Sequence, residues 1–297
     1  MTSTVFLALA MAVTFDDLHA QGFERASASS ARTINKRIVA TLKKRSIPGI
    51  AFVNEQGLET DGKVDPKRVA ALAYWLDAGM ELGNHTYAHP SLHKVPLDEY
   101  LRQISDGERV TRPLAASRGR LYGWFRHPFL QTGRDLATKH AVEAYLADHG
   151  YRVAPVTIDN SEWVFARAYA QARRLGDEAQ QIRLGAAYLD YMMRVVAYYE
   201  KQSDLLFGRQ IPQVLLVHAN ALNAEYFDDL ADRIAARGYR WIPLGDAVAD
   251  EAYRSADEFV GNGGITWLHR WALTLGGREL IVPDEPTVPE WVAKGAE

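Results

Sequence analysis

Two histidines and a pair of adjacent acids have the residue types and spacing of a metal site for hydrolysis. His85 and His89 stand four residues apart in "GNHTYAHP", so both rings can reach one ion from a helical turn or a compact loop. Two imidazoles and one carboxylate suit Zn²⁺ or a similar divalent ion with one position left for water. "TFDD" offers Asp16 and Asp17, and His93 is a third histidine at the same spacing. Hydrolysis also needs a base for the water and an acid for the leaving group.

Other titratable residues follow apolar stretches in the same way. Arg126 and His127 stand in "FRHPF", Asp159 and Glu162 in "TIDNSEW", and His218 in "LLVHAN". Functional side chains of parallel α/β proteins collect where the strands end. Because nearly every apolar stretch ends in a titratable group, we expect these residues to surround one site.

The adjacent acids constrain where the first strand ends. Successive side chains of a regular strand point to opposite faces, so Asp16 and Asp17 could not share one role there. We expect the strand to end before them, so that the backbone turns and both acids face one cavity.

The order of apolar and amphipathic stretches predicts the elements that position these residues. Strand-like runs occupy 5–15, 47–54, 80–85, 121–129, 151–159 and 213–220, and helical stretches occupy 31–46, 65–79, 97–116 and 133–150. The helix at 65–79 has Asp65 as N-cap, Pro66 in its first turn and Gly79 as its stop. Strands alternating with helices predict an α/β fold with a parallel sheet, either a barrel or a doubly wound sheet.

Two segments depart from this alternation within what we interpret as a single domain, 1–297. Residues 162–208 form an aromatic-rich helical insertion, too long for one crossover helix, with a turn at Gly176–Asp177. We interpret the insertion as packing over the barrel, with partial contact to the site. Residues 255–297 are rich in Pro and Gly and predict a C-terminal extension that wraps the surface.

Composition excludes several other kinds of site. The chain of 297 residues contains no cysteine, which removes disulfides, thiolate zinc sites and cysteine nucleophiles. Its formal net charge of −3 offers no basic footprint for nucleic acid. "MTSTVFLALAMA" imitates a signal peptide, but it lacks a basic start and is short for a membrane span of about 20 residues. We interpret it as the first core strand and expect no membrane span.

Five motifs, taken in order, resemble those of the polysaccharide deacetylases, the NodB-homology proteins of the carbohydrate esterase family 4 type. They are "TFDD", "HTYAH", "RHPF", "DNSEW" and "LLVH", and the resemblance spans residues 5–220. It implies a distorted (β/α) barrel and a metal-dependent hydrolase that removes N-acetyl groups from an amino sugar, peptidoglycan or a related glycan. It also implies one divalent metal ion, with zinc preferred over cobalt, manganese or nickel. The family's typical substrates favour a periplasmic or secreted location, with a native leader absent from this sequence.

The resemblance assigns roles around the metal. Asp17, His85 and His89 would bind the ion. Asp16 would be the general base that deprotonates the metal-bound water. Arg126 would keep Asp16 ionised and oriented, as a cation beside a carboxylate does.

On the leaving-group side, the resemblance makes His218 the general acid that protonates the departing amine. The family has Asp where "DNSEW" has Glu162, and that acid orients the catalytic histidine. Either the longer Glu162 or Asp159 takes this role, with Glu162 slightly favoured by its position.

Further residues of the resemblance concern the substrate. The backbone N–H of Phe129 would stabilise the oxyanion, and Trp163 and Leu216 would surround the acetyl methyl group, or simply belong to the core. Leu18 departs from the family, which often has Gly-Pro after the two acids. His19 beside it is interpreted as an exposed residue without a role, in preference to a residue at the rim.

Three other functions remain to be weighed against glycan deacetylation. The same scaffold could hydrolyse small amides, cyclic imides or esters, which a closed pocket would favour. A glycan-binding protein without catalysis is disfavoured by the presence of all five motifs. Glycoside hydrolysis by paired carboxylates would leave the two histidines and the arginine without roles.

Overall fold

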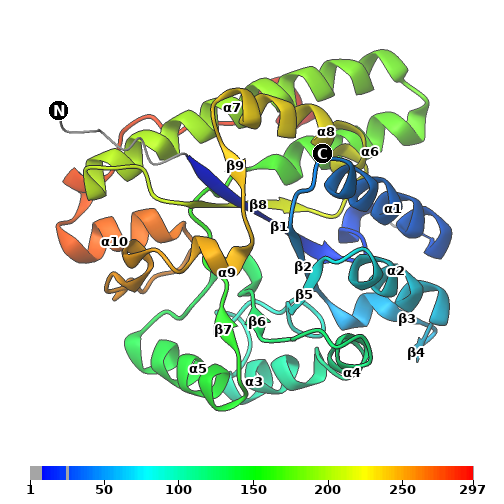
Figure 1. Cartoon of the computed structure of the whole chain (residues 1–297), viewed down its shortest axis with the longest axis horizontal. Coiled ribbons are helices and arrows are strands. Elements are labelled where there is room, and N and C mark those ends of the chain that lie inside the picture. Colours follow the sequence, from blue (N-terminus) through cyan, green and yellow to red (C-terminus); the bar gives the residue numbers. More distant parts are fainter. Residues whose placement is uncertain (1–8, 25–26, 297) are drawn as a thin grey trace.

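The computed structural model describes residues 9–24 and 27–296 (Figure 1). Its centre is a sheet in the order β7-β6-β5-β2-β1-β8, with β9 paired to β1 and every pair parallel. The strands are β1 (Ala10–Leu18), β2 (Gly49–Val53), β5 (Glu81–Asn84), β6 (Trp124–Phe125), β7 (Arg152–Val153), β8 (Gln213–His218) and β9 (Arg240–Trp241). Helices surround the sheet, which confirms the predicted α/β class.

A single parallel bridge brings the two ends of the sheet together. Ile158, in the extended segment after β7, pairs with Leu215 of β8. The amide of Ile158 donates to the carbonyl of Val214 at 3.0 Å, and the amide of Leu216 donates to the carbonyl of Ile158 at 3.2 Å. The sheet therefore curls into a distorted barrel that is nearly closed on this side.

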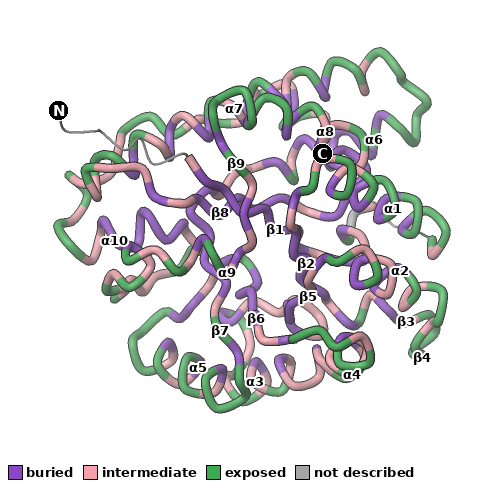
Figure 2. The backbone as a smooth tube through the Cα atoms, viewed as in Figure 1, coloured by how far each residue is buried: buried purple, intermediate pink, exposed green. Residues whose placement is uncertain are grey.

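β1 is the central strand. Its pairing partners are β2 on one side and β8 on the other, and its residues are buried apart from the partly exposed Asp17 (Figure 2). Part of the predicted strand, residues 5–8, lies outside the described residues. Because hydrophobic cover on both faces requires a continuous apolar run, the sequence before Asp16 carries no polar alternation.

The helices on one side of the barrel follow their sequence signals. α1 (Ala28–Lys44) buries Ile34, Ile38, Val39 and Leu42, the residues expected on its apolar face. α2 (Pro66–Asp77) starts as expected, because the Asp65 side chain accepts a hydrogen bond from the amide of Lys67. α8 (Ala221–Ala236) packs beside α1, and Arg45 pairs with Asp228 and Asp232 across them.

The helix predicted at 97–116 is two helices, and the residue where the first one ends contacts the loop of the candidate site. α3 (Leu97–Asp106) ends at Gly107, and a separate α4 (Thr111–Ala116) follows. A Cβ at Gly107 would lie 2.5 Å from the carbonyl carbon of Thr86, so only glycine allows this close approach. Gly107 thus packs against the loop that carries the two histidines of the predicted metal site.

Two predicted strands are much shorter than expected. The runs at 121–129 and 151–159 contribute only the two-residue strands β6 and β7. Most of the remaining apolar residues of these runs are buried in extended loops and in the short helix η3 (Pro128–Leu130), whereas Leu121 and Phe129 are exposed. An apolar run therefore indicates burial more directly than strand pairing. α5 (Leu136–Asp148) lies between the two strands in sequence.

The helical segment after β7 contains two helices, as expected. α6 (Glu162–Leu175) ends at Gly176, whose φ of 69° lies in the left-handed region, and α7 (Glu178–Phe207) begins after the N-cap Asp177. α7 runs along one edge of the molecule in Figure 1. No boundary of the insertion, 162–208, or of the extension, 255–297, is tested, and both stay predictions.

The C-terminal residues do more than wrap the surface. They contain α10 (Trp267–Leu275) and α11 (Glu290–Lys294), after the short α9 (Leu244–Ala247). The side chain of Gln202 on α7 donates to the carbonyl of Leu280 at 2.7 Å and accepts from the amide of Val282 at 2.8 Å. This anchors the chain so that residues 285–288 reach the barrel mouth. Among the described residues, no helix is both long and apolar enough to cross a membrane.

Candidate active site

A bulge in β1 places both adjacent acids at one cavity. Phe15 pairs with Ala51 and Leu18 pairs with Val53, so between these two pairs β1 contains one more residue than β2. Asp17 lies in this interval with a φ of 61°, a left-handed conformation that breaks the alternation of side chains. The expectation that the strand ends before the acids is therefore wrong: the strand continues to Leu18, and the bulge turns both carboxylates to the same side.

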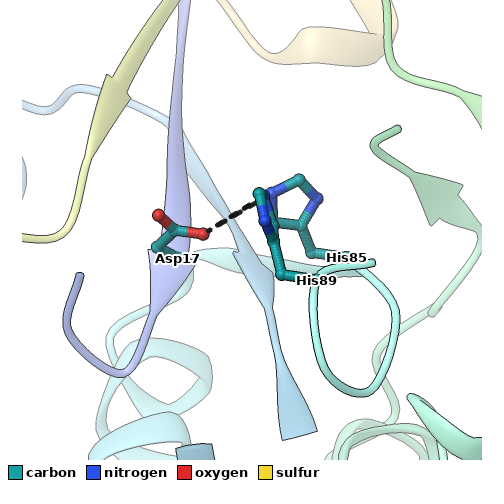
Figure 3. Close-up of side chains that lie close together, drawn as sticks. All are labelled: Asp17, His85 and His89. Atoms are coloured by element: carbon teal, nitrogen blue, oxygen red, sulfur yellow. Dashed lines mark ion pairs between the residues drawn. The ribbon is translucent and has the colours of Figure 1, made fainter. Parts of the chain in front are cut away.

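Asp17, His85 and His89 converge (Figure 3). The Nε2 atoms of His85 and His89 each lie 3.7 Å from Oδ1 of Asp17, and one ligand atom from each of the three residues lies within 4.8 Å of the others. The Nδ1 atom of His85 lies 2.8 Å from the carbonyl of Arg126, which fixes its ring and turns Nε2 to Asp17. Burial, followed by the neighbouring His89, keeps the pKa of His85 well below its usual value, so its lone pair is available. Two imidazoles and one carboxylate fit a divalent transition-metal ion.

Asp16 is the most enclosed of the acids around the cavity, with 3% of its surface exposed. Burial raises its pKa, and the charge of Arg126, then that of His218, opposes this. The Nε atom of Arg126 lies 3.8 Å from Oδ1 of Asp16, while its Nη2 donates to Oγ1 of Thr14 at 2.8 Å. Oδ1 of Asp16 has no hydrogen-bond partner in the described part of the chain, and Oδ2 lies 3.8 Å from Nε2 of His85, on the side of the ligand cluster.

His218 of β8 is paired with Asp16 of β1, and Glu162 hydrogen-bonds its ring on the side away from Nε2. Its Nδ1 lies 2.8 Å from Oε2 of Glu162, which is fully buried at the start of α6. The side chains of Asn220 and Asn223 donate to Oε1 of Glu162 at 2.5 and 2.8 Å. Burial disfavours the charged ring, but the hydrogen bond and charge of Glu162 outweigh it and raise the pKa of His218 to about 9.

Asp159 does not take that position. Its Oδ1 accepts a hydrogen bond from the amide of Asn160 at 2.8 Å, and no bond to His218 is found among the described residues. Burial, with a contribution from Glu285, raises the pKa of Asp159 to about 6. Of the two acids that sequence reasoning left open, Glu162 is the one in contact with His218.

With the geometry in place, comparison with known proteins becomes informative. The sequence profile of the family described as polysaccharide deacetylase matches residues 8–154. Residues 8–154 belong to the polysaccharide deacetylase family. A search of curated proteins finds no match. The matched part of the chain contains Asp16, Asp17 and both histidines of the ligand cluster, whereas Glu162 and His218 lie beyond it.

Solved structures show the same fold along most of the chain. A variant of a Bacillus anthracis pseudoenzyme of carbohydrate esterase family 4, with restored enzymatic activity, is 19% identical over 82% of this chain and 69% of that one, with a TM-score of 0.53. A Bacillus subtilis peptidoglycan deacetylase is 18% identical over 85% and 96%, with a TM-score of 0.51. The chitin deacetylase of the fungus Colletotrichum lindemuthianum is 17% identical over 82% and 88%, with a TM-score of 0.54. The predicted distorted (β/α) barrel is confirmed.

The candidate site opens into a cavity of about 780 Å³. Phe129 stands at its wall with a φ of 56°, and its half-exposed ring packs 4.4 Å from that of His89 between centroids. Trp163 lines the cavity with 44% of its surface exposed, and Leu216 lines it from β8 while nearly buried. All three residues line the cavity that also contains the predicted metal ligands.

Sequence reasoning missed part of the cavity wall. Gln21, Tyr191 of α7 and residues 285–288 also line it. The hydroxyl of Tyr199 donates to Oε1 of Glu285 at 2.5 Å, which ties the C-terminal segment to α7. The aromatic richness of α7 is a weak signal for this wall, whereas the C-terminal segment carries none.

Two histidines behave differently from their sequence interpretation. His93, the third candidate ligand, has its Nδ1 3.0 Å from the carbonyl of Asn262 and is absent from the described ligand cluster. His19 is not exposed: only 6% of its surface is accessible, because its ring packs between Arg68 and Gly57. The sequence around His19 did not indicate this burial, because a histidine close to two acids is usually expected at the surface.

Proposed function

We propose that the protein is a metal-dependent deacetylase that removes N-acetyl groups from an amino sugar unit of a glycan such as peptidoglycan. One observation carries the proposal. A carboxylate whose Oδ2 lies beside His85, Asp16, and a histidine with a raised pKa, His218, flank a three-residue ligand cluster in a single cavity. This is the base, acid and Lewis-acid set that amide hydrolysis requires.

The residues that would hold the ion are Asp17, His85 and His89. Zinc suits this donor set, and cobalt, manganese or nickel are alternatives. When bound, such an ion polarises the amide carbonyl and lowers the pKa of water.

Asp16 acts as the general base of the proposed reaction. It accepts a proton from the water whose oxygen attacks the acetyl carbonyl carbon, and the buried guanidinium of Arg126 favours its ionised form before that transfer. The backbone N–H of Phe129 stabilises the negative charge that develops on the carbonyl oxygen, and Trp163 and Leu216 surround the methyl group.

His218 acts as the general acid. Nδ1 of His218 donates its hydrogen bond to Glu162, so Nε2 is the ring nitrogen that can interact with the substrate. Nε2 donates a proton to the amide nitrogen as the carbon–nitrogen bond breaks, which yields acetate and a free amine. The buried negative charge of Glu162 stabilises the protonated ring before the transfer.

Two single substitutions separate these roles. Asp16→Asn should lower the rate of acetate release by about 10²- to 10⁴-fold while metal content stays equal to that of the wild type. Asp17→Asn should lower metal content itself. Near-normal acetate release by Asp16→Asn would remove Asp16 from the base position, and metal loss in Asp16→Asn would move it to the ligand set.

Hydrolysis of small amides, cyclic imides or esters is the second candidate. The wall formed by Tyr191 and residues 285–288 favours it, because it restricts one side of the cavity. A panel of acetylated chito-oligosaccharides, small amides and aryl esters, each with chelator and metal add-back, discriminates the two. Turnover of small amides alone would replace the glycan proposal, and failure to bind any divalent metal would favour a binding protein without catalysis.

The location follows from the substrate. Glycans such as peptidoglycan lie outside the cytoplasm, so we place the protein in the periplasm or outside the cell. Fractionation of the native host with an antibody to the chain tests this placement, and a cytoplasmic signal alone would contradict it.

A further inference from the structure

A segment near the C-terminus packs against the loop that contains Phe129. We call residues 261–270 the C-terminal strap, and they lie beyond residues 8–154, the part of the chain that matches the family profile. The amide of Gly261 donates to the carbonyl of Gly133 at 3.4 Å, and the Nδ1 atom of His93 lies 3.0 Å from the carbonyl of Asn262. The strap therefore lies along the loop 129–133, which carries the proposed oxyanion donor.

Two consecutive residues of this loop have an unfavourable backbone conformation. Phe129 has a φ of 56° and Leu130 a φ of 53°, both in the left-handed region that residues with a side chain seldom adopt. Such a conformation persists only where the surrounding structure enforces it. Contacts from outside the loop must therefore hold these two residues in place.

Arg270 of α10 supplies one of these contacts. Its Nη2 atom donates to the carbonyl of Leu130, and its Nη1 atom donates to Oγ1 of Thr132 at 2.6 Å. The side chain is fully buried, with Nη1 3.7 Å from Oδ2 of Asp257 and the guanidinium 4.4 Å from the ring centroid of Trp267. Because a guanidinium is planar and its donors have a fixed geometry, this buried group fixes the positions of its acceptors.

Gly264 supplies the second contact. A Cβ at Gly264 would lie 1.7 Å from the carbonyl oxygen of Phe129 and 2.7 Å from the carbonyl carbon of Leu130, so the two backbones can approach only because no side chain is present. A Cβ at the neighbouring Gly263 would meet nothing within 4 Å. The strap thus contains one glycine that the loop requires and one that it does not.

These contacts also fix the direction of the Phe129 amide. Gly264 and Arg270 hold the carbonyl groups that follow it, and the amide of Leu130 donates to the carbonyl of His127 at 3.0 Å. Within the described ranges, the amide of Phe129 has no backbone hydrogen-bond partner, and Phe129 lines the large cavity. An N–H held in this way is preorganised, as the stabilisation of an oxyanion requires.

We propose that Arg270 and Gly264 are positioning residues, which hold the backbone of Phe129 so that its N–H donates to the oxyanion formed on the acyl carbonyl. The inference rests on the proposed deacetylase function. Neither residue is among those that line the large cavity, so both act through the loop and not by contact with the substrate.

The first test observes the Phe129 amide in the metal-loaded protein labelled with ¹⁵N-phenylalanine. Phe129→Tyr removes one signal and so identifies it. Methylphosphonate, a tetrahedral mimic of the hydrated acetyl group, should shift this signal in the wild type and in Gly263→Ala. The shift should be lost in Gly264→Ala, because the added methyl group displaces the carbonyl of Phe129. An unshifted signal in the wild type, or an equal shift in Gly264→Ala, would overturn the proposal.

The second test is kinetic. Gly264→Ala should lower kcat for acetate release by about 10²-fold, the cost of misplacing a reacting group by about 1 Å, with KM and metal content equal to those of the wild type. Gly263→Ala should match the wild type in all three. Arg270→Lys keeps the positive charge but loses the paired donors to the loop, so it should show the same loss in kcat. Arg270→Lys carries the test if Gly264→Ala does not fold.

Three kinetic results would contradict these roles. Lower unfolding free energy with wild-type kcat in the folded variants would make both residues part of the core alone. Loss of metal would place the effect on His89, whose ring packs against that of Phe129. An equal loss of kcat in Gly263→Ala would remove the distinction between the two glycines.

The strap and the proposed function fail in different ways. Acetate release from a glycan with wild-type kcat in both Gly264→Ala and Arg270→Lys would overturn the strap and leave the deacetylase standing. A wild type that releases no acetate from any acetylated glycan would overturn the proposed function. A methylphosphonate shift that is lost in Gly264→Ala would still support the positioning of Phe129 in that case.

Discussion

The two halves of the candidate site are built in opposite ways. In the ligand half, formed by Asp17, His85 and His89, both histidine Nε2 atoms lie 3.7 Å from the carboxylate, beyond hydrogen-bonding distance. In the acid half, Glu162 receives three side-chain hydrogen bonds of 2.5 to 2.8 Å. Hydrogen bonds between protein side chains hold the acid half in place. In the ligand half, the ligand atoms of the three residues converge without hydrogen-bonding to one another. We infer that the ligand half needs a bound ion to hold its side chains together and that the acid half does not.

The largest effect expected from this contrast is on the acid half. His218→Gln removes the proposed proton donor, so kcat should fall by about 10²- to 10⁴-fold. Metal affinity should not change, because His218 is outside the ligand half. Acetate release and metal content, measured on the same preparation, check both parts. A loss of metal in His218→Gln would mean that the halves are not independent.

The next effect concerns the backbone behind the ligand half. Gly107→Ala puts a Cβ 2.5 Å from the backbone of Thr86 and 2.8 Å from that of Tyr87, so the histidine loop must shift. Displaced ligands commonly lose about 10- to 100-fold in metal affinity. Competition with a coloured chelator measures this loss, and Gly245→Ala serves as the control with unchanged affinity. Wild-type affinity in Gly107→Ala would show that the loop tolerates the added methyl group.

A smaller effect separates the charge of Glu162 from its shape. Glu162→Gln removes the interaction that overcomes burial and raises the pKa of His218 to about 9. If protonated His218 is required, wild-type kcat/KM should decline as pH rises through about 9, and the decline should move to lower pH in the variant. A pH profile on a fixed substrate measures this, and coincident profiles would remove Glu162 from the control of His218.

The same group gives a stability prediction with a definite sign. A histidine with a raised pKa in the folded state contributes stability that is fully present below about pH 6.5 and is lost as pH rises through about 9. Chemical unfolding of wild type and Glu162→Gln across this interval should therefore converge at high pH. A gap that stays constant with pH would attribute the difference to packing alone.

Much of this site could be predicted from sequence because the family motifs sit at strand ends. Asp16, His85 and His218 were placed correctly around one cavity, since parallel strands bring their carboxyl ends to one edge. The choice between Asp159 and Glu162 could not be made from sequence, because the path of the backbone from Asp159 into α6 decides which carboxylate faces His218.

Other features depend on contacts that no local pattern encodes. The bulge at Asp17 arises from the register of β1 against β2. The paired residues are far apart in sequence, since Val13 pairs with Gly49 and Leu18 with Val53. The burial of His19 requires Arg68 from a different element. The C-terminal segment reaches the cavity through Gln202 and Tyr199 of α7, a long-range docking with no motif.

The smallest effect reports how far the organisation of the acid half extends. Tyr188 of α7 donates to Oδ1 of Asn223 at 2.7 Å, and Asn223 in turn donates to Glu162. Tyr188→Phe leaves this buried oxygen without its donor, which should cost about 1–3 kcal/mol of unfolding free energy. The side-chain amide of Asn223 also donates to the backbone carbonyl of His218 at 2.9 Å, so the Asn223 side chain should keep its orientation in the variant. We therefore expect kcat within about threefold of wild type and an unchanged pH profile. A shift of the alkaline decline in Tyr188→Phe, in unfolding and rate measurements made side by side, would extend the acid half from α6 into α7.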